Sequence, residues 1–344
     1  MYNKIISTKN DKEKKINSLK SSKNLIENSH AEFCLDNTFC LFKSIYNILY
    51  LIYPTHNLSI ISYNLIDNKI INEIKNAHEA FITNFRHILD LKNKMDLIIS
   101  ISAEDKVIKL WNINDWFCLL NIENINQYGY LFSACFLKDN NNIYILTSNV
   151  FKNPEKIKLY DIKGKKINEI NESNDNTYFI DVYHENYSEN QLSDIYIITC
   201  NLGYIKSFHY NKNKLYHIYN SNDKSGHCSA VIYMDNFNNV KLIESSFDGN
   251  IRIWNFHSGL LFNKIGINIY LYGICLWNKE YLFFGSRDKK IRILELNSGK
   301  IIRELSGHNN RVLCVKIIDH PEFGDLLISQ EFDFGDIKIC LFDN

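Results

Sequence analysis

Short segments in which apolar and polar residues alternate recur along the whole chain. Seven of them end in an aromatic or apolar residue: Ile60–Tyr63, Val107–Trp111, Lys156–Tyr160, Tyr204–Phe208, Ile251–Trp254, Ile291–Leu294 and Ile337–Leu341. Alternation with a period of two is typical of a β-strand that buries one face. The pattern therefore predicts seven similar strands.

The last residues of these segments, here called the marker residues, keep a regular spacing. They are residues 63, 111, 160, 208, 254, 294 and 341, and the intervals between them are 48, 49, 48, 46, 40 and 47 residues. Each interval has room for about four short strands with their turns, which is the size of one β-propeller blade. We therefore expect an all-β protein: a seven-bladed β-propeller with four antiparallel strands in each blade.

Histidines recur in phase with the marker residues. His30, His78 and His308 each lie 33 residues before their own marker, and His227 lies 27 residues before Trp254. The pairs Ala77-His78, Gly226-His227 and Gly307-His308 resemble the Gly-His dipeptide of WD40 repeats, and Trp111-Asn112 and Tyr160-Asp161 resemble the Trp-Asp dipeptide. The chain thus resembles the WD40-repeat β-propellers over residues 23–344, more closely in units two, five, six and seven than in units three and four.

This resemblance implies a buried chain of hydrogen bonds from Asp to His to Ser to Trp in each well-preserved unit. In unit two it would join Asp105, His78, Ser100 or Ser102, and Trp111. In unit five it would join Asp248, His227, Ser245 or Ser246, and Trp254. Unit six has Ser286 and Asp288 but lacks the His, and unit seven has His308 and Ser329, with Asp333 or Asp336 as its Asp. Units six and seven also lack the Trp, and because an incomplete polar network holds less firmly than a full one, we expect these blades to be less rigid.

The two ends of the sequence predict how the ring closes. The last unit stops after its third strand, whereas other units continue with a fourth, such as Lys69–Ile74 and Lys300–Leu305. Lys23–Asn28 precedes His30 as Lys69–Ile74 precedes His78. We therefore expect residues 23–28 to complete the seventh blade, which removes an exposed strand edge. Residues 1–22 would be a flexible tail, and residues 23–344 the propeller, with units ending near residues 75, 122, 170, 219, 265, 305 and 344.

Composition narrows the functional classes. The 39 basic and 39 acidic residues balance, so there is no global attraction to nucleic acid or to an anionic membrane. None of the nine cysteines forms a CxxC pair, which favours reduced thiols over a zinc site or a disulfide framework. The sequence shows no signal-peptide core, and its longest apolar stretch, residues 45–53, is too short to cross a bilayer. We expect a cytoplasmic or nuclear protein that is not secreted and uses no cofactor.

Catalytic motifs are absent from the sequence: it contains no Walker loop, no GxGxxG, no HExxH and no GxSxG. The repeated His, Asp and Ser residues resemble a hydrolytic triad, but a nucleophile is needed once and not in several units. We therefore expect neither an enzyme nor a metal site. A phosphoinositide-binding propeller would carry a paired-Arg signature, and the nearest segment, Phe85-Arg86-His87, lacks the second Arg and the following Gly.

Binding residues are expected on the face formed by the loops that join successive units. The residue before each turn Asp points to this face; these residues are Glu104, Phe247, Arg287 and Phe332, and Arg311 lies near the same rim. Exposed aromatic side chains are costly unless they pack or bind, and aromatic residues and Arg dominate interface hot spots. Alternatively, both Phe side chains fold against neighbouring loops. A polar insertion at residues 185–194 of unit four is either plain surface or a further partner contact.

These features favour a non-catalytic scaffold for protein–protein interactions within a multi-subunit intracellular complex, in which the propeller itself is a monomer. One alternative is a subunit that reads a peptide or an RNA for a ubiquitin ligase or another modifying enzyme. A second is a phosphoinositide-binding propeller.

Overall fold

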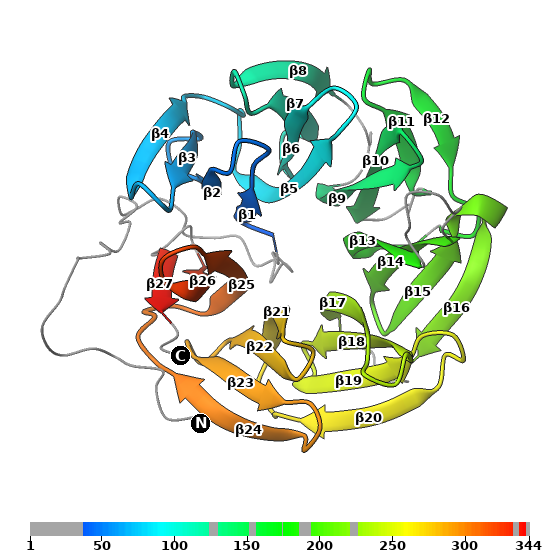
Figure 1. Ribbon diagram of the computed structural model, residues 1–344. Coiled ribbons are helices and arrows are strands. Elements are labelled where there is room, and N and C mark those ends of the chain that lie inside the picture. The colour runs from blue at the N-terminus through cyan, green and yellow to red at the C-terminus, as the bar shows by residue number, and fades with distance from the viewer. Residues whose placement is uncertain are drawn as a thin grey trace, which may run out of the picture.

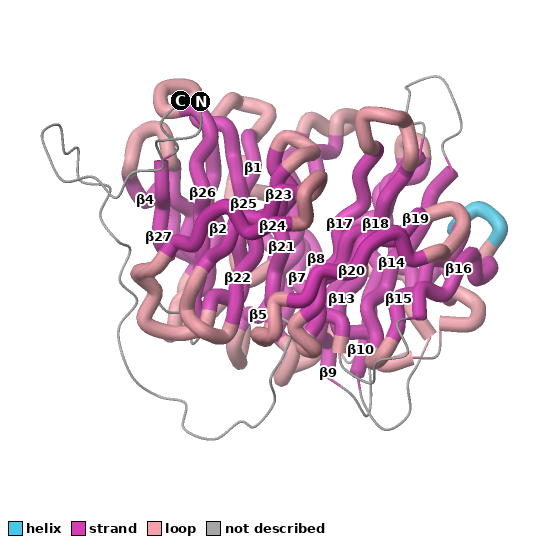
Figure 2. The backbone as a smooth tube through the Cα atoms, turned by 90° about the horizontal axis from the view of Figure 1, so that it is seen from below, coloured by secondary structure: helices cyan, strands magenta, loops and turns pink. Residues whose placement is uncertain are grey.

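A computed structural model describes residues 37–123, 130–150, 156–173, 175–185, 194–220, 226–332 and 337–341. Over these residues the chain forms seven antiparallel sheets arranged around a central axis (Figure 1), so the protein is an all-β, seven-bladed propeller as the sequence predicts. Seen from the side, the strands run between two faces that carry the loops (Figure 2).

The strands follow one another in chain order, four to a blade in blades 1 to 6 and three within the described residues of blade 7. Blade 1 contains β1 (Cys40–Lys43), β2 (Leu49–Pro54), β3 (Ile60–Asn64) and β4 (Lys69–Ile74). Blade 2 contains β5 (Ile82–Asp90), β6 (Met95–Ser102), β7 (Val107–Asn112) and β8 (Phe117–Ile122). Blade 3 contains β9 (Tyr130–Asp139), β10 (Asn142–Val150), β11 (Lys158–Asp161) and β12 (Lys166–Glu169). Blade 4 contains β13 (Thr177–Glu185), β14 (Asp194–Asn201), β15 (Tyr204–His209) and β16 (Lys214–Asn220), with a 3₁₀ turn at Tyr210–Lys212.

Blade 5 contains β17 (His227–Met234), β18 (Val240–Ser246), β19 (Asn250–Asn255) and β20 (Leu261–Gly266). Blade 6 contains β21 (Leu271–Trp277), β22 (Tyr281–Ser286), β23 (Ile291–Glu295) and β24 (Lys300–Leu305). Blade 7 contains β25 (Val312–His320), β26 (Gly324–Glu331) and β27 (Ile337–Leu341). The first strand of each blade lies nearest the axis and the fourth lies at the rim (Figure 1). The fourth strand expected in blade 7, from residues 23–28, lies outside the described residues.

The marker residues occupy one structural position. In six blades the pairing of the third and fourth strands shifts register directly before the marker, at Tyr63, Trp111, Tyr160, Phe208, Trp254 and Leu294. Such a bulge bends the outer strand and increases its twist.

The marker assigned to blade 7 was wrong by one residue. Leu327 pairs with Cys340 as Ile98 pairs with Trp111, so Cys340 and not Leu341 occupies the marker position. The segment ends in two consecutive apolar residues, which makes its last inward position ambiguous in a pattern of period two.

Neighbouring blades share apolar cores. Leu97 and Ile99 of blade 2, for example, belong to one buried cluster with Leu131 and Ile145 of blade 3. Blades 6 and 7 approach closely at Gly285 of β22, where a Cβ would lie 2.3 Å from the carbonyl oxygen of Val312 in β25. The backbones of blades 6 and 7 are therefore in direct contact at this point.

Candidate interaction face

One type of hydrogen bond recurs in three consecutive blades. It links the loop that enters the blade to the turn between the second and third strands. The amide of Phe247 donates to Gly226 O (3.0 Å), and that of Arg287 donates to Tyr270 O (3.0 Å). In blade 7 the amide of Phe332 donates to Arg311 O (2.8 Å). This repeated bond holds the residue before the first strand beside the residue after the second strand.

Side chains at these positions form a continuous aromatic–arginine cluster across blades 5 to 7, made up of Phe247, Tyr270, Tyr272, Arg287, Arg311 and Phe332. The Phe247 ring packs against Tyr270 (centroids 6.0 Å apart) and Tyr272 (5.8 Å). The Arg287 guanidinium carbon lies 4.9 Å from the centre of the Tyr270 ring, and that of Arg311 lies 4.4 Å from the Phe332 ring. Arg311 Nη1 also donates to Tyr272 Oη (3.4 Å), so each blade contacts the next.

The cluster joins four of the five surface residues expected from the sequence. Both Phe side chains are half-buried: each packs on its neighbours and keeps part of its surface in solvent, and binding through them stays a prediction. Glu104 is exposed in the β6–β7 turn, and among the described residues no contact links it to the cluster. Sequence reasoning missed Tyr270, which is 39 % exposed, and Tyr272, which is buried. Tyr270 directly precedes β21 as Arg311 precedes β25, so alignment of the units would have found it.

Blade 2 contains the full chain of buried hydrogen bonds. Trp111 Nε1 donates to Ser100 Oγ (2.8 Å), which lies 2.8 Å from His78 Nε2, and His78 Nδ1 lies 3.2 Å from Asp105 Oδ2. Ser100, and not Ser102, is therefore the link. Burial lowers the pKa of His78, so the imidazole is neutral and donates from Nδ1 to the carboxylate. The chain fastens the loop before β5 to the two central strands of the blade.

Blade 7 builds a similar chain with a different carboxylate. His308 Nε2 lies 2.8 Å from Ser329 Oγ, and His308 Nδ1 lies 3.1 Å from Glu331 Oε2. The same oxygen accepts the backbone amides of Asn309 (2.7 Å) and Asn310 (3.1 Å). Glu331 at the end of β26 thus has the role expected for Asp333 or Asp336, both of which lie outside the described residues.

Blade 5 does not follow the expected arrangement. The register pairs His227 with Ser246, as Ile82 pairs with Ser102, so His227 begins a strand and does not occupy the loop position of His78. Its side chain lies outside the described part. Glu244 holds the strand position that Ser100 holds in blade 2.

In blade 5 the Asp of the turn, Asp248, belongs to a network of ion pairs. Arg252, 1 % exposed, donates to Glu244 Oε1 (3.1 Å) and pairs with Asp248, whose pKa falls to about 2. Ser245 Oγ donates to Tyr272 O (2.6 Å), and Ser246 Oγ donates to Gly226 O (3.1 Å). Among the described residues, Trp254 Nε1 has no acceptor.

Blade 6 uses the same kind of ion pair. Arg292 Nη1 donates to Ser286 Oγ (2.8 Å) and Asp288 Oδ1 (3.0 Å), and Arg292 Nε donates to Glu304 Oε1 (2.7 Å). The hydrogen bonds from Arg292 lower the pKa of Asp288 to about 2. Arg292 lies two residues before the marker Leu294, as Arg252 lies two residues before Trp254. An Arg–Asp pair therefore stabilises the β22–β23 turn in place of a His chain.

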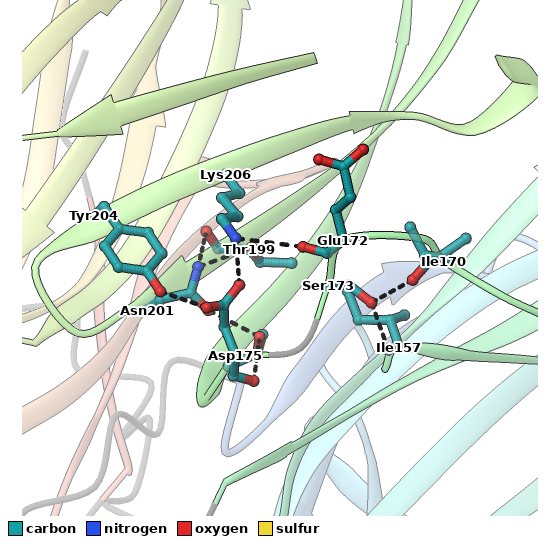
Figure 3. Close-up of polar contacts among 10 residues, drawn as sticks. Ile157, Ile170, Glu172, Ser173, Asp175, Thr199, Asn201, Tyr204 and Lys206 are labelled. Carbon is teal, nitrogen blue, oxygen red and sulfur yellow. Dashed lines mark hydrogen bonds and ion pairs between the residues drawn. The ribbon is translucent and has the colours of Figure 1, made fainter. Parts of the chain in front are cut away.

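Blade 4 shows a third solution, which nothing in the sequence indicated (Figure 3). Asp175, in the loop before β13, accepts hydrogen bonds from Tyr204 Oη (2.5 Å) and Lys206 Nζ (2.6 Å) of β15. Lys206 Nζ also donates to the carbonyl of Glu172 (3.3 Å), and Ser173 Oγ accepts the amide of Ile157 in blade 3 (2.9 Å). The loop is thus fastened to its own blade and to the preceding one.

Two further observations limit the chemistry of the described residues. Within them, no group of three or more His, Cys, Asp or Glu side chains is arranged to hold a metal ion. No helix among them is long and apolar enough to span a membrane. In the segment nearest to a phosphoinositide signature Phe85 is buried, the half-buried Arg86 donates to Ile180 O (3.1 Å), and the half-buried His87 bonds Asp96 (2.8 Å).

The seven blades define a seven-bladed β-propeller, and its marker bulge and the His–Ser–Trp chain of blade 2 are consistent with the resemblance to WD40 repeats. Comparison with known proteins agrees with this class. Residues of the chain are 28 % identical over 110 positions to U3 small nucleolar RNA-associated protein 21 homolog of Schizosaccharomyces pombe, and 26 % identical over 123 positions to Autophagy-related protein 16 of Arabidopsis thaliana. Both relatives are WD40-repeat proteins.

These matches cover only parts of each protein. They span 32 % and 34 % of this chain, and 12 % and 24 % of the two relatives. No protein-family model matches the chain.

Proposed function

We propose that this protein is a non-catalytic scaffold that binds other proteins through the aromatic–arginine cluster on the loop face of blades 5 to 7. The observation that carries the proposal is the continuity of the cluster, in which ring and guanidinium contacts connect six side chains from three blades. Tyr, Phe and Arg are residue types that contribute strongly to protein interfaces. Packing against one another also limits the side-chain entropy that such residues lose on binding.

The relatives support an intracellular, complex-bound role. One is named for association with a small nucleolar RNA and the other for autophagy, so their names point to different processes. The similarity to each relative covers about a third of this chain, so it supports a shared kind of platform and names no ligand for this chain. The chain is accordingly proposed to act in the cytoplasm or the nucleus. A subunit that reads a peptide or an RNA for a modifying enzyme would use the same face.

Variants of the cluster test this proposal. We expect Phe247→Ala combined with Arg287→Glu to reduce recovery of specific partners at least tenfold in quantitative affinity purification. The thermal midpoint should fall only modestly, because Arg287 is exposed and Phe247 is half-buried, and the ring should stay folded. Phe117→Ala is the matched control, since Phe117 is 63 % exposed on the rim strand β8. If the double variant retains every partner that the wild-type protein recovers, the cluster is not the interaction face.

A further inference from the structure

The innermost strands bring one residue from each blade to the same level around the axis. The register identifies these seven equivalent residues, here called the axial ring: Cys40, Arg86, Cys135, Asp181, Val231, Cys275 and Lys316. Each pairs with a residue of the second strand. That residue pairs in turn with the third-strand residue that directly precedes the marker. The seven strands that carry them surround the centre of the propeller (Figure 1).

Charges of the axial ring act across blade boundaries. Burial raises the pKa of the Cys40 thiol to about 12, while Arg86 of blade 2 and Lys316 of blade 7 oppose this rise. Burial also raises the pKa of Cys135, and Arg86 and Asp181 act on that thiol as well. Side chains from five blades therefore share one electrostatic environment. The ring contains two cations and one carboxylate, so it is net positive.

Arg86 is held in a fixed orientation. Its Nη2 donates to the carbonyl of Ile180 in blade 4 (3.1 Å), and its guanidinium carbon lies 5.3 Å from the centre of the Phe179 ring. The side chain thus extends from blade 2 past blade 3 to blade 4. Its Nε is buried and has no acceptor among the described residues. A buried donor without a partner destabilises the folded state, and it does so more strongly when the group is charged.

Three neighbouring polar groups share this property. Asn37 Nδ2, Thr38 Oγ1 and Asn84 Oδ1 are buried without hydrogen-bond partners in the described protein, and their residues are only 3 %, 2 % and 4 % exposed. The amide of Phe85 donates to Asn37 O (2.8 Å), which places Asn37 and Thr38 beside the strand of Arg86. Asn84 precedes Arg86 by two residues on the same side of β5. Because the amide orientation of Asn84 is an assignment, this side chain can also present its NH₂ group.

Polarity changes along the axis. The residues two positions before the axial ring, toward the loop face, are mostly small or polar: Thr38, Asn84, Ser133, Phe179, Ser229, Gly273 and Cys314. Those two positions after it are apolar or aromatic: Phe42, Ile88, Leu137, Tyr183, Tyr233, Trp277 and Ile318. The unpartnered polar groups therefore lie on the loop-face side of an apolar layer.

We propose that Arg86, with Asn37, Thr38 and Asn84, binds a small oxyanion, a carboxylate or a phosphate, that approaches along the axis from the loop face. The planar guanidinium group has a donor geometry that matches the oxygens of carboxylate and phosphate groups, and its Nε–H is one of these donors. Lys316 adds positive charge at the same level, and the Thr38 hydroxyl supplies a further donor. The ligand is either a free anion or an anionic group of a partner protein.

Titration with simple anions tests this proposal. Inorganic phosphate and acetate are added to the full-length protein at constant ionic strength, and the thermal midpoint and heat of binding are recorded. We expect a saturable response to at least one anion. Arg86→Met, which keeps the length of the side chain and removes its donors, should weaken binding at least tenfold. Lys300→Met, on the exposed rim strand β24, should bind as the wild-type protein does.

The outcomes are decisive in both directions. The proposal is wrong if neither anion gives a saturable response, or if Arg86→Met responds as the wild-type protein does. If Arg86→Met does not fold, Thr38→Val decides, because it removes one hydroxyl without changing volume or charge: weaker binding supports the site and unchanged binding overturns it. Competition by a phosphoserine peptide or an aspartate peptide would identify a partner chain as the source, and its absence would identify a free anion.

Discussion

At the scale of single residues, some members of the hydrogen-bond chains could be predicted from the sequence and others could not. His78 and Trp111 stand at the spacing that the repeat requires, and the structure joins them through Ser100. Glu331 could not be foreseen, because its carboxylate comes from the end of β26 and not from the turn that follows. His227 satisfied the dipeptide pattern but its distance from Trp254 was six residues short, and that difference places it in a strand.

Protonation of His78 provides a test at this scale. Burial lowers its pKa below the usual value of about 6.5, so the folded protein keeps His78 neutral where the unfolded chain takes up a proton. Stability from this group is therefore complete above about pH 6.5 and is lost as the pH falls through that value. We expect the free energy of unfolding, measured with urea, to decrease between pH 7.5 and 5.5.

The matched variant is His78→Gln, which retains an amide able to donate and accept. Because His184 and His209 also have lowered pKa values, both proteins should lose stability on acidification. The wild-type protein should lose more of it. Equal slopes in the two proteins would show that His78 does not remain neutral in the folded state.

The strands could be predicted from the sequence better than the contacts of the loops that connect them. Strand alternation located the third strand of every blade, and six of the seven marker residues sit at the bulge between the third and fourth strands. Alternation alone could not fix the register of β27, where two apolar residues adjoin. Nor could it reveal the Asp175 network of blade 4, because that network depends on how a loop folds back over β15.

Gly285 tests the packing between two elements. A methyl group at this position would meet the backbone carbonyl of Val312 at 2.3 Å, and a backbone atom cannot move aside as a flexible side chain can. We expect Gly285→Ala to lower the free energy of unfolding by about 1–3 kcal/mol, the range for overpacking a core.

Gly266→Ala is the comparison, because its added methyl would lie 3.6 Å from the nearest side-chain atom, at van der Waals distance. It should cost clearly less. Equal losses in the two variants would mean that blades 6 and 7 do not approach as closely as described.

At the scale of the whole molecule, one prediction concerns how the ring is closed. If residues 23–28 form the fourth strand of blade 7, deleting residues 1–22 should leave the thermal midpoint unchanged, whereas deleting residues 1–28 should lower it. The longer deletion would expose the edge of β27 and break the ring's continuity. Equal midpoints for the two truncated proteins would show that this segment does not close the propeller.

At the scale of the whole molecule, the spacing of the marker residues predicts the seven blades, but it does not predict the aromatic–arginine cluster. The spacing reports each blade separately, because one strand pattern recurs within each unit. The cluster depends on contacts between blades, such as Phe247 with Tyr270 and Arg311 with Tyr272, which no single unit contains. Four of its residues were nevertheless located by their place next to turns, and the two tyrosines completed it.

The proposal that this loop face binds partners is tested most directly by hydrogen–deuterium exchange of the protein alone and in complex with its main partner. We predict protection in the β18–β19 and β22–β23 turns and in the loops that end at Tyr270 and Arg311. The rim strands β4, β8 and β24 should exchange equally in both states. Protection confined to those rim strands, with unchanged exchange in the loops of blades 5 to 7, would contradict the proposal.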